Sequence, residues 1–175
     1  APLSSDSGLL FAGAADSWFT SGMMNAKLRT APIVFKDGIA ALPRSFESSL
    51  YMFNKEGKVI EGYPLELDGI FAAAPVFFEE TKGKPAAAFV SEDGRFSIRS
   101  MAENYEELAA CDLNTVCKAD LVYSASLRAF FVVSQDGHLF KFNTAGAITD
   151  SLPLKTGAAD DYRITLLDVT GDGKD

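Results

Sequence analysis

Few side chains in this sequence have the types and spacing that catalysis needs. The single histidine, His138, follows Asp136-Gly137 in a predicted hairpin turn, which is typical of a surface residue. The sequence contains no Gly-x-Ser-x-Gly elbow, no His-Glu-x-x-His, no Walker-type loop and no complete Gly-x-Gly-x-x-Gly fingerprint. The paired carboxylates Glu79-Glu80 and Asp160-Asp161 are adjacent, and neighbours in a strand point to opposite faces. These patterns favour a protein without a catalytic site.

The two cysteines, Cys111 and Cys117, are separated by five residues in a polar segment. A loop of that length can be closed by a disulfide if the geometry allows, and two free thiols are the alternative. A zinc site is disfavoured, because it needs four ligands and the only histidine lies far along the chain. A disulfide would place the chain in an oxidising compartment. We therefore expect an extracytoplasmic protein, whether secreted, periplasmic or at the cell surface.

Composition narrows the class of protein. The chain has 175 residues, of which 47% are hydrophobic and 23% charged, a mixture that fits one folded domain. Its formal net charge is −8, and Lys and Arg form no cluster, so we expect neither nucleic acid nor an anionic membrane surface as a partner. The longest apolar run, residues 70–78, is far shorter than the ~20 residues that span a bilayer.

An internal repeat organises the chain. Residues 50–60 (LYMFNKEGKVI) match residues 139–149 (LFKFNTAGAIT) at a constant offset of 89, with Leu, Phe, Asn and Gly identical. The same offset carries Pro64-Leu65 onto Pro153-Leu154. A unit of about half that length is visible in the apolar centres Ile33, Val76, Leu121 and Ile164, which are spaced by 43, 45 and 43 residues. A period of this size is typical of a repeat architecture.

Each unit contains a predicted hairpin. Residues 87–98 (AAFVSEDGRFSI) and 130–141 (FFVVSQDGHLFK) both have an apolar run, an Asp-Gly pair and an alternating run. Asp-Gly between such runs indicates a hairpin, because Gly accepts the positive φ of the turn. Residues 9–20 are a degenerate copy of the same hairpin pattern. Residues 102–110 (AENYEELAA) contain good helix formers, so a short helical insertion is expected where the repeat requires an outer strand.

Short strands, frequent turns and a repeat of about 40–45 residues predict an all-β fold, a β-propeller; a β-sandwich is the alternative. The complete blades are expected at about 31–73, 74–118 and 119–161. Residues 9–30 and 162–175 would supply the two parts of a further blade. Joined, these parts would close a four-bladed ring; otherwise the chain is a fragment of a larger propeller whose open edges need further blades or a partner chain.

The sequence resembles propellers built from FG-GAP/VCBS-type and PQQ-like repeats. Residues 54–57 (NKEG) and the following residues 62–65 (GYPL) are similar to the connection between blades in these proteins. Residues 167–175 (LDVTGDGKD) are similar to the FG-GAP segment. That resemblance implies a possible calcium loop at Asp168, Thr170 and Asp172, because a hard cation needs several oxygen ligands. A quinone cofactor is disfavoured, since the tryptophan docking motif of PQQ dehydrogenases is missing and Trp18 is the only tryptophan.

Two functions follow as expectations. The first is a non-catalytic extracytoplasmic propeller that serves as a protein-interaction, assembly or adhesion module, in which loops at one face select a protein partner. The second is a carbohydrate-binding or carbohydrate-active propeller, with Trp18 and Tyr63 as aromatic surface candidates for stacking on sugars. No catalytic or cofactor-binding residue is predicted, and calcium is the only metal considered.

Overall fold

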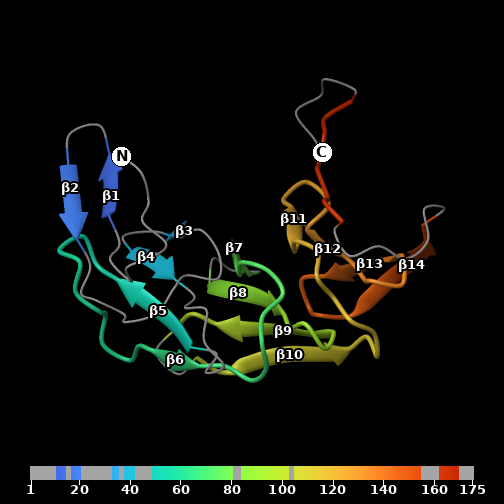
Figure 1. Ribbon diagram of the computed structural model, residues 1–175, viewed down its shortest axis with the longest axis horizontal. Coiled ribbons are helices and arrows are strands. Elements are labelled where there is room, and N and C mark those ends of the chain that lie inside the picture. Colours follow the sequence, from blue (N-terminus) through green and yellow to red (C-terminus); the bar gives the residue numbers. More distant parts are fainter. Residues whose placement is uncertain are drawn as a thin grey trace. The chain divides into compact units, whose positions relative to one another are not determined.

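The computed structural model describes residues 11–14, 17–20, 33–35, 38–41, 49–80, 84–102, 105–154 and 162–169 (Figure 1). All regular structure in these residues is β-strand, and the strands pair antiparallel with their neighbours in sequence. The chain divides into two compact units, residues 1–70 and 71–175. The all-β prediction is therefore confirmed.

The first unit contains a hairpin and one four-stranded sheet. Among the described residues, strands β1 (Phe11–Ala14) and β2 (Ser17–Thr20) pair only with each other. The sheet runs in the order β3-β4-β5-β6, and its strands are β3 (Ile33–Phe35), β4 (Gly38–Ala41), β5 (Ser49–Phe53) and β6 (Leu65–Glu66).

The second unit contains two four-stranded sheets, each a meander of consecutive strands. The first sheet consists of β7 (Val76–Glu79), β8 (Pro85–Val90), β9 (Arg95–Ser100) and β10 (Glu107–Asp112). The second consists of β11 (Val122–Ser124), β12 (Ala129–Val133), β13 (His138–Asn143) and β14 (Ile148–Pro153). Both Asp-Gly pairs connect the second and third strands of their sheets, as the hairpin pattern predicts.

The prediction of a helix over residues 102–110 is wrong for the second half of that segment. Residues 107–112 form β10, which pairs with β9 through a register that shifts between Glu107 and Ala109. Ala109 and Cys111 are half-buried while their neighbours are exposed, which is the alternation of an outer strand. Pairing with β9 and one-sided packing outweigh the helix propensity of Glu, Leu and Ala.

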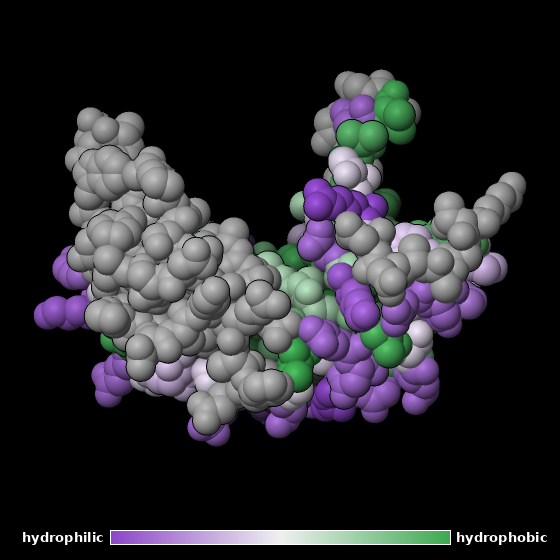
Figure 2. Space-filling view, in the orientation of Figure 1, coloured by the Kyte–Doolittle hydropathy of each residue, from purple (hydrophilic) through white to green (hydrophobic). Residues whose placement is uncertain are grey.

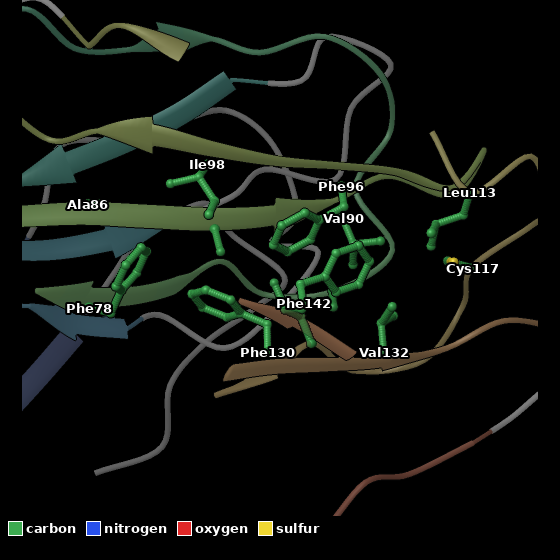
Figure 3. Close-up of a cluster of buried hydrophobic side chains, with 13 residues drawn as sticks. Phe78, Ala86, Val90, Phe96, Ile98, Leu113, Cys117, Phe130, Val132 and Phe142 are labelled. Carbon is green, nitrogen blue, oxygen red and sulfur yellow. The ribbon is translucent and has the colours of Figure 1, made fainter. Parts of the chain in front are cut away.

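A cluster of buried side chains joins the two sheets of the second unit (Figure 3). Phe96 from β9 stacks on Phe142 from β13, and Phe78 from β7 meets Phe130 from β12 edge to face, with ring centroids 4.9 Å apart. Small residues fill the remaining space in this cluster, since Ala86 and Ala88 on β8 are fully buried there. Alternation along each strand explains the pattern, because every second side chain points to the same face.

The predicted repeat is visible in the turns. Asn54 and Asn143, which the offset of 89 aligns, each accept two backbone N–H groups with the side-chain oxygen. The glycine three residues later, Gly57 or Gly146, has positive φ in both turns. A Cβ on Gly146 would lie 2.5 Å from the Cβ of Ala109 on β10, so this turn packs directly on the neighbouring sheet.

Residues 162–169, expected to provide the first strand of a further blade, form no strand in the described part of the chain. Burial nevertheless alternates: Tyr162, Ile164 and Leu166 are half-buried, and the residues between them are exposed. This is the period of a strand that has one sheltered face.

Candidate functional site

Two hairpin turns with the same internal structure lie at one end of the second unit. Residues 91–95 connect β8 to β9, and residues 134–138 connect β12 to β13. In each turn the serine hydroxyl donates to the aspartate two residues on, Ser91 to Asp93 and Ser134 to Asp136. Each buried serine oxygen also accepts the backbone N–H four residues later, at 3.0 Å and 3.1 Å. The turns therefore hold their aspartates in a fixed geometry.

The segment between the two sheets, residues 113–117, ties both turns together. The Leu113 N–H donates to the Gly94 carbonyl and the Cys117 N–H to the Glu92 carbonyl, both at 3.0 Å. On the other side, the Gln135 N–H donates to the Val116 carbonyl at 2.7 Å. We call residues 91–95, 113–117 and 134–138 together the turn face. It is a rigid surface, because its backbone is hydrogen-bonded across both sheets.

Gly94 is required for this arrangement. It has a φ of +88°, and a Cβ placed there would lie 2.0 Å from the carbonyl oxygen of Thr115. Only a residue without a side chain lets the connecting segment approach so closely.

The turn face has three acidic side chains, one arginine (Arg95) and one exposed apolar residue. Asp93 and Asp136 are exposed, Glu92 is half-buried, and Val116 between the two turns is 41% exposed. The hydrogen bond from Ser134 is the main factor that lowers the pKa of Asp136, with further contributions from His138 and Thr115. Asp136 and His138 also form an ion pair at 3.3 Å when the histidine is protonated. The turn face thus carries fixed negative charge at neutral pH.

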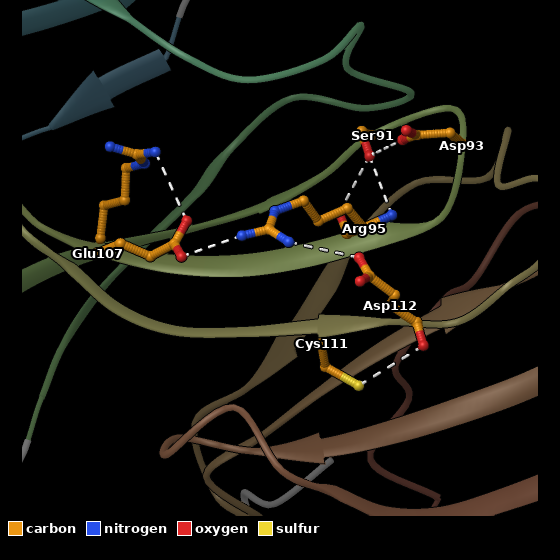
Figure 4. A network of polar contacts seen from close by, with 7 residues as sticks. Ser91, Asp93, Arg95, Glu107, Cys111 and Asp112 are labelled. Carbon is orange, nitrogen blue, oxygen red and sulfur yellow. Dashed lines mark hydrogen bonds and ion pairs between the residues drawn. The ribbon is translucent and has the colours of Figure 1, made fainter.

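Within the turn face, Arg95 links two strands (Figure 4). Its guanidinium donates to Glu107 at 3.0 Å and to Asp112 at 3.4 Å, both on β10, while Arg99 contacts Glu107 at 3.5 Å. These partly exposed pairs hold the outer strand in register, and each is worth little energy by itself.

The cysteines are free thiols in the structure, so the expected disulfide between Cys111 and Cys117 is not formed. Cys117 lies in the buried cluster between the two sheets (Figure 3), whereas the Cys111 Sγ on β10 is directed at the carbonyl of Asp112 (Figure 4). Burial, with the nearby charges of Asp136 and Asp93, raises the pKa of the Cys117 thiol to about 11. Such a thiol is protonated and unreactive at neutral pH.

The structure describes the other predicted site residues only in part. Trp18 is on β2, opposite Gly13, and its side chain lies outside the described part of the structure. Tyr63 is half-buried before a cis bond to Pro64, and its N–H donates to the carbonyl of Ile60. Asp168 is exposed. Thr170 and Asp172 lie outside the described residues, so calcium binding stays a prediction.

Among the residues that the structure describes, no group of three or more His, Cys, Asp or Glu side chains is placed to hold a metal ion. No helix in the described part of the chain is long and apolar enough to cross a membrane.

The comparisons with known proteins concern the fold. No family model matches the sequence, and no curated protein is similar to it. Solved structures do match. BBS1N in complex with ARL6DN has a TM-score of 0.60 at 14% identity, covering 84% of this chain and 50% of that one. BamB from Moraxella catarrhalis has a TM-score of 0.57 at 15% identity, covering 83% and 44%. The computationally designed Ika8 protein has a TM-score of 0.54 at 11% identity, covering 93% and 52%.

These likenesses define the fold class. BBS1N and BamB are β-propellers, and the consecutive antiparallel sheets described above have the organisation of propeller blades, so the chain has a β-propeller fold. It spans about half the length of the solved structures that it matches. The number of blades and the more specific likeness to FG-GAP/VCBS repeats stay predictions.

Sequence reasoning identified the two Asp-Gly turns but not the segment that joins them. Asn114, Thr115 and Val116 belong to no motif, and only the backbone bonds from residues 113–117 place them between the turns. For the internal structure of the two turns a signal was available in the sequence. A serine stands two residues before the aspartate of each Asp-Gly pair, and Ser and Asp at that spacing commonly form a hydrogen bond within a turn.

Proposed function

We propose that this chain is a protein-interaction module and that the turn face binds a partner protein with a basic surface. One observation carries the proposal: two equivalent turns and the segment between them hold Asp93 and Asp136 in fixed positions on either side of the exposed Val116. Rigid groups lose little entropy on binding, so such a surface suits recognition. Unlike charges across an interface mainly raise the association rate and the specificity.

The fold supports the same role. One structure with this fold, BBS1N, is in complex with another protein, ARL6DN. Loops on a rigid β-scaffold are common binding sites, since they vary without loss of the core. The sign of the partner's surface follows from the acidic turn face and from the net charge of −8.

The test begins with proximity labelling to identify partners in the source cells, and continues with calorimetry on one purified partner. We expect the double variant Asp93→Asn/Asp136→Asn to bind more weakly, and the affinity of the parent chain to fall with added salt. Asparagine keeps an oxygen that can accept the serine hydroxyl, so the turns are preserved. Glu66→Gln/Glu79→Gln is the matched control, because it also removes two exposed carboxylates and both lie outside the turn face.

Equal affinity of the double variant and the control would contradict the proposal. Binding to a glycan array that is lost in Tyr63→Ala, with no effect of the turn-face variant, would replace it with the carbohydrate-binding function.

A further inference from the structure

Three Asp-Gly pairs lie within the described residues, and their surroundings differ. Residues 93–94 and 136–137 belong to the turn face, whereas residues 68–69 lie in the connection from β6 to β7. An Asp-Gly pair can change covalently without an enzyme, because glycine has no side chain to hinder the approach of its backbone nitrogen to the aspartate carboxyl group. The same dipeptide therefore has the same chemistry at all three places, and the structure decides where that chemistry occurs.

The reaction has two steps and consumes only water. The backbone nitrogen of the glycine attacks the Cγ of the protonated aspartate, so that an N–Cγ bond forms and the Cγ–OH bond breaks. The hydroxyl group and the amide proton leave as water, and a five-membered succinimide remains. Water then opens the ring, either at Cγ to restore aspartate, or at the α-carbonyl to leave isoaspartate. In isoaspartate the main chain runs through the side-chain carbon and is one carbon longer.

The turn face opposes the first step. The attacking nitrogens would come from Gly94 and Gly137, which are buried and donate their N–H groups to the Ser91 and Ser134 carbonyls, both at 3.0 Å. The hydroxyls of the same two serines donate to the aspartate carboxylates. Ring closure would therefore require the nitrogen and the carboxyl group to leave their hydrogen-bond partners at once, which amounts to a local opening of the turn.

The charge of Asp136 acts in the same direction. Its pKa is lowered, mainly by the hydrogen bond from Ser134. The reacting form of the side chain is the protonated acid, so a lowered pKa leaves less of it at neutral pH.

The pair at residues 68–69 differs in burial and in its local sequence. Asp68 and Gly69 are both exposed, and the preceding strand β6 has only two residues. The residue two positions before the aspartate is Glu66, which has no hydroxyl group equivalent to that of the turn serines. The φ of Gly69 is +87°, close to the values of +88° and +84° in the turn face, so glycine conformation does not distinguish the three pairs. Hydrophilic residues make up much of the described surface visible in Figure 2, and the second step takes its water from solvent at such a surface.

We propose that Asp68–Gly69 is a site of isoaspartate formation in the native chain, and that the hydrogen bonds of the turn face protect the other two pairs. The site directly precedes the boundary between the two compact units, at residues 70 and 71. Each event adds one carbon to the main chain at that connection. The site contains no turn-face residue, so the inference is independent of the partner-binding role proposed above.

Peptide mapping of the aged chain tests the proposal. The purified chain is kept at neutral pH and physiological temperature, native in one sample and unfolded in guanidinium chloride in the other. Trypsin then gives the peptides 59–82, 83–95 and 129–141, each of which contains one aspartate, and electron-transfer mass spectrometry measures isoaspartate in each. We expect similar rates in the unfolded chain. In the native chain, peptide 59–82 should gain isoaspartate several-fold faster than the other two.

Ser134→Ala tests the reason for the protection. This variant should form isoaspartate at Asp136 several-fold faster than the parent chain, while Asp93, which keeps Ser91, provides the internal control. Circular dichroism verifies that the fold is kept. Equal rates at the three pairs in the native chain, or a rate at Asp68 that folding lowers as much as the other two, would overturn the proposal. An unchanged rate at Asp136 in Ser134→Ala would overturn the protective role of the serine.

Discussion

The ring of Phe96 on β9 stacks on the ring of Phe142 on β13, with centroids 4.1 Å apart and an angle of 16° between the planes. The pair joins the two sheets of the second unit, and Phe130 packs against the same ring of Phe96 at 5.6 Å. Both stacked rings are fully buried. The contact between sheets in this unit thus depends on a few large aromatic side chains.

Phe142→Ala should destabilise the second unit strongly. Removing a fully buried ring leaves a cavity between the sheets and typically costs about 3–5 kcal/mol in the free energy of unfolding. Urea denaturation followed by circular dichroism measures this loss. Leu127→Ala, at an exposed turn position, should change the same quantity little. A loss no larger than that of the control would mean that the ring is not part of the core.

Gly94→Ala should destabilise the chain more than Gly62→Ala. Both glycines have a φ of +88°, a conformation that costs a residue with a side chain about 1–2 kcal/mol. At Gly94 the added Cβ also meets the Thr115 carbonyl oxygen at 2.0 Å, so the connecting segment must move. Gly62 is exposed. Urea denaturation compares the two variants, and equal losses would show that the close approach to Thr115 is absent in solution.

Ser134→Ala should raise the pKa of Asp136, because the hydroxyl of Ser134 is the main cause of its lowered value. A carboxylate whose folded pKa is lowered adds stability above its unfolded pKa, and that stability is lost as the pH falls through the folded pKa. The stability that this hydrogen bond gives the parent chain over the variant should therefore be present above the unfolded pKa of Asp136 and should be lost as the pH falls through the folded pKa. NMR titration of the carboxyl carbon measures the shift. An Asp136 titration that is identical in both proteins would contradict the assignment of the Ser134 hydroxyl as the main cause of the lowered pKa.

Alkylation should distinguish the two cysteines. The Cys111 thiol is partly accessible, whereas Cys117 is buried and its pKa is raised to about 11, so little thiolate forms there. Without reductant, intact-mass spectrometry after iodoacetamide treatment at mildly alkaline pH should show one adduct on the native chain and two on the unfolded chain.

Cys111→Ser is the control, and it should abolish the adduct of the native chain. Adducts that form only after a reductant is added would show a disulfide, contrary to the structure. The extracytoplasmic location stays a prediction.

Local patterns in the sequence predicted the strands and turns of the second unit well. The Asp-Gly pairs and the aligned Asn54 and Asn143 act through bonds within a few residues, so their effect is visible in the sequence. The period of the apolar centres indicated repeated sheets for the same reason. The helix expected over residues 102–110 failed because pairing with β9, a contact with another strand, decides that segment.

The sequence by itself determined the all-β class, the repeat and the two hairpin turns, because strand alternation and turn chemistry are local properties. Only the tertiary structure decided that residues 113–117 join the turns and that Cys117 is buried apart from Cys111. It also decided which face of the sheet β11–β14 packs against the preceding sheet. These outcomes depend on how sheets pack against each other, and the contacts that fix that packing join residues far apart in the chain.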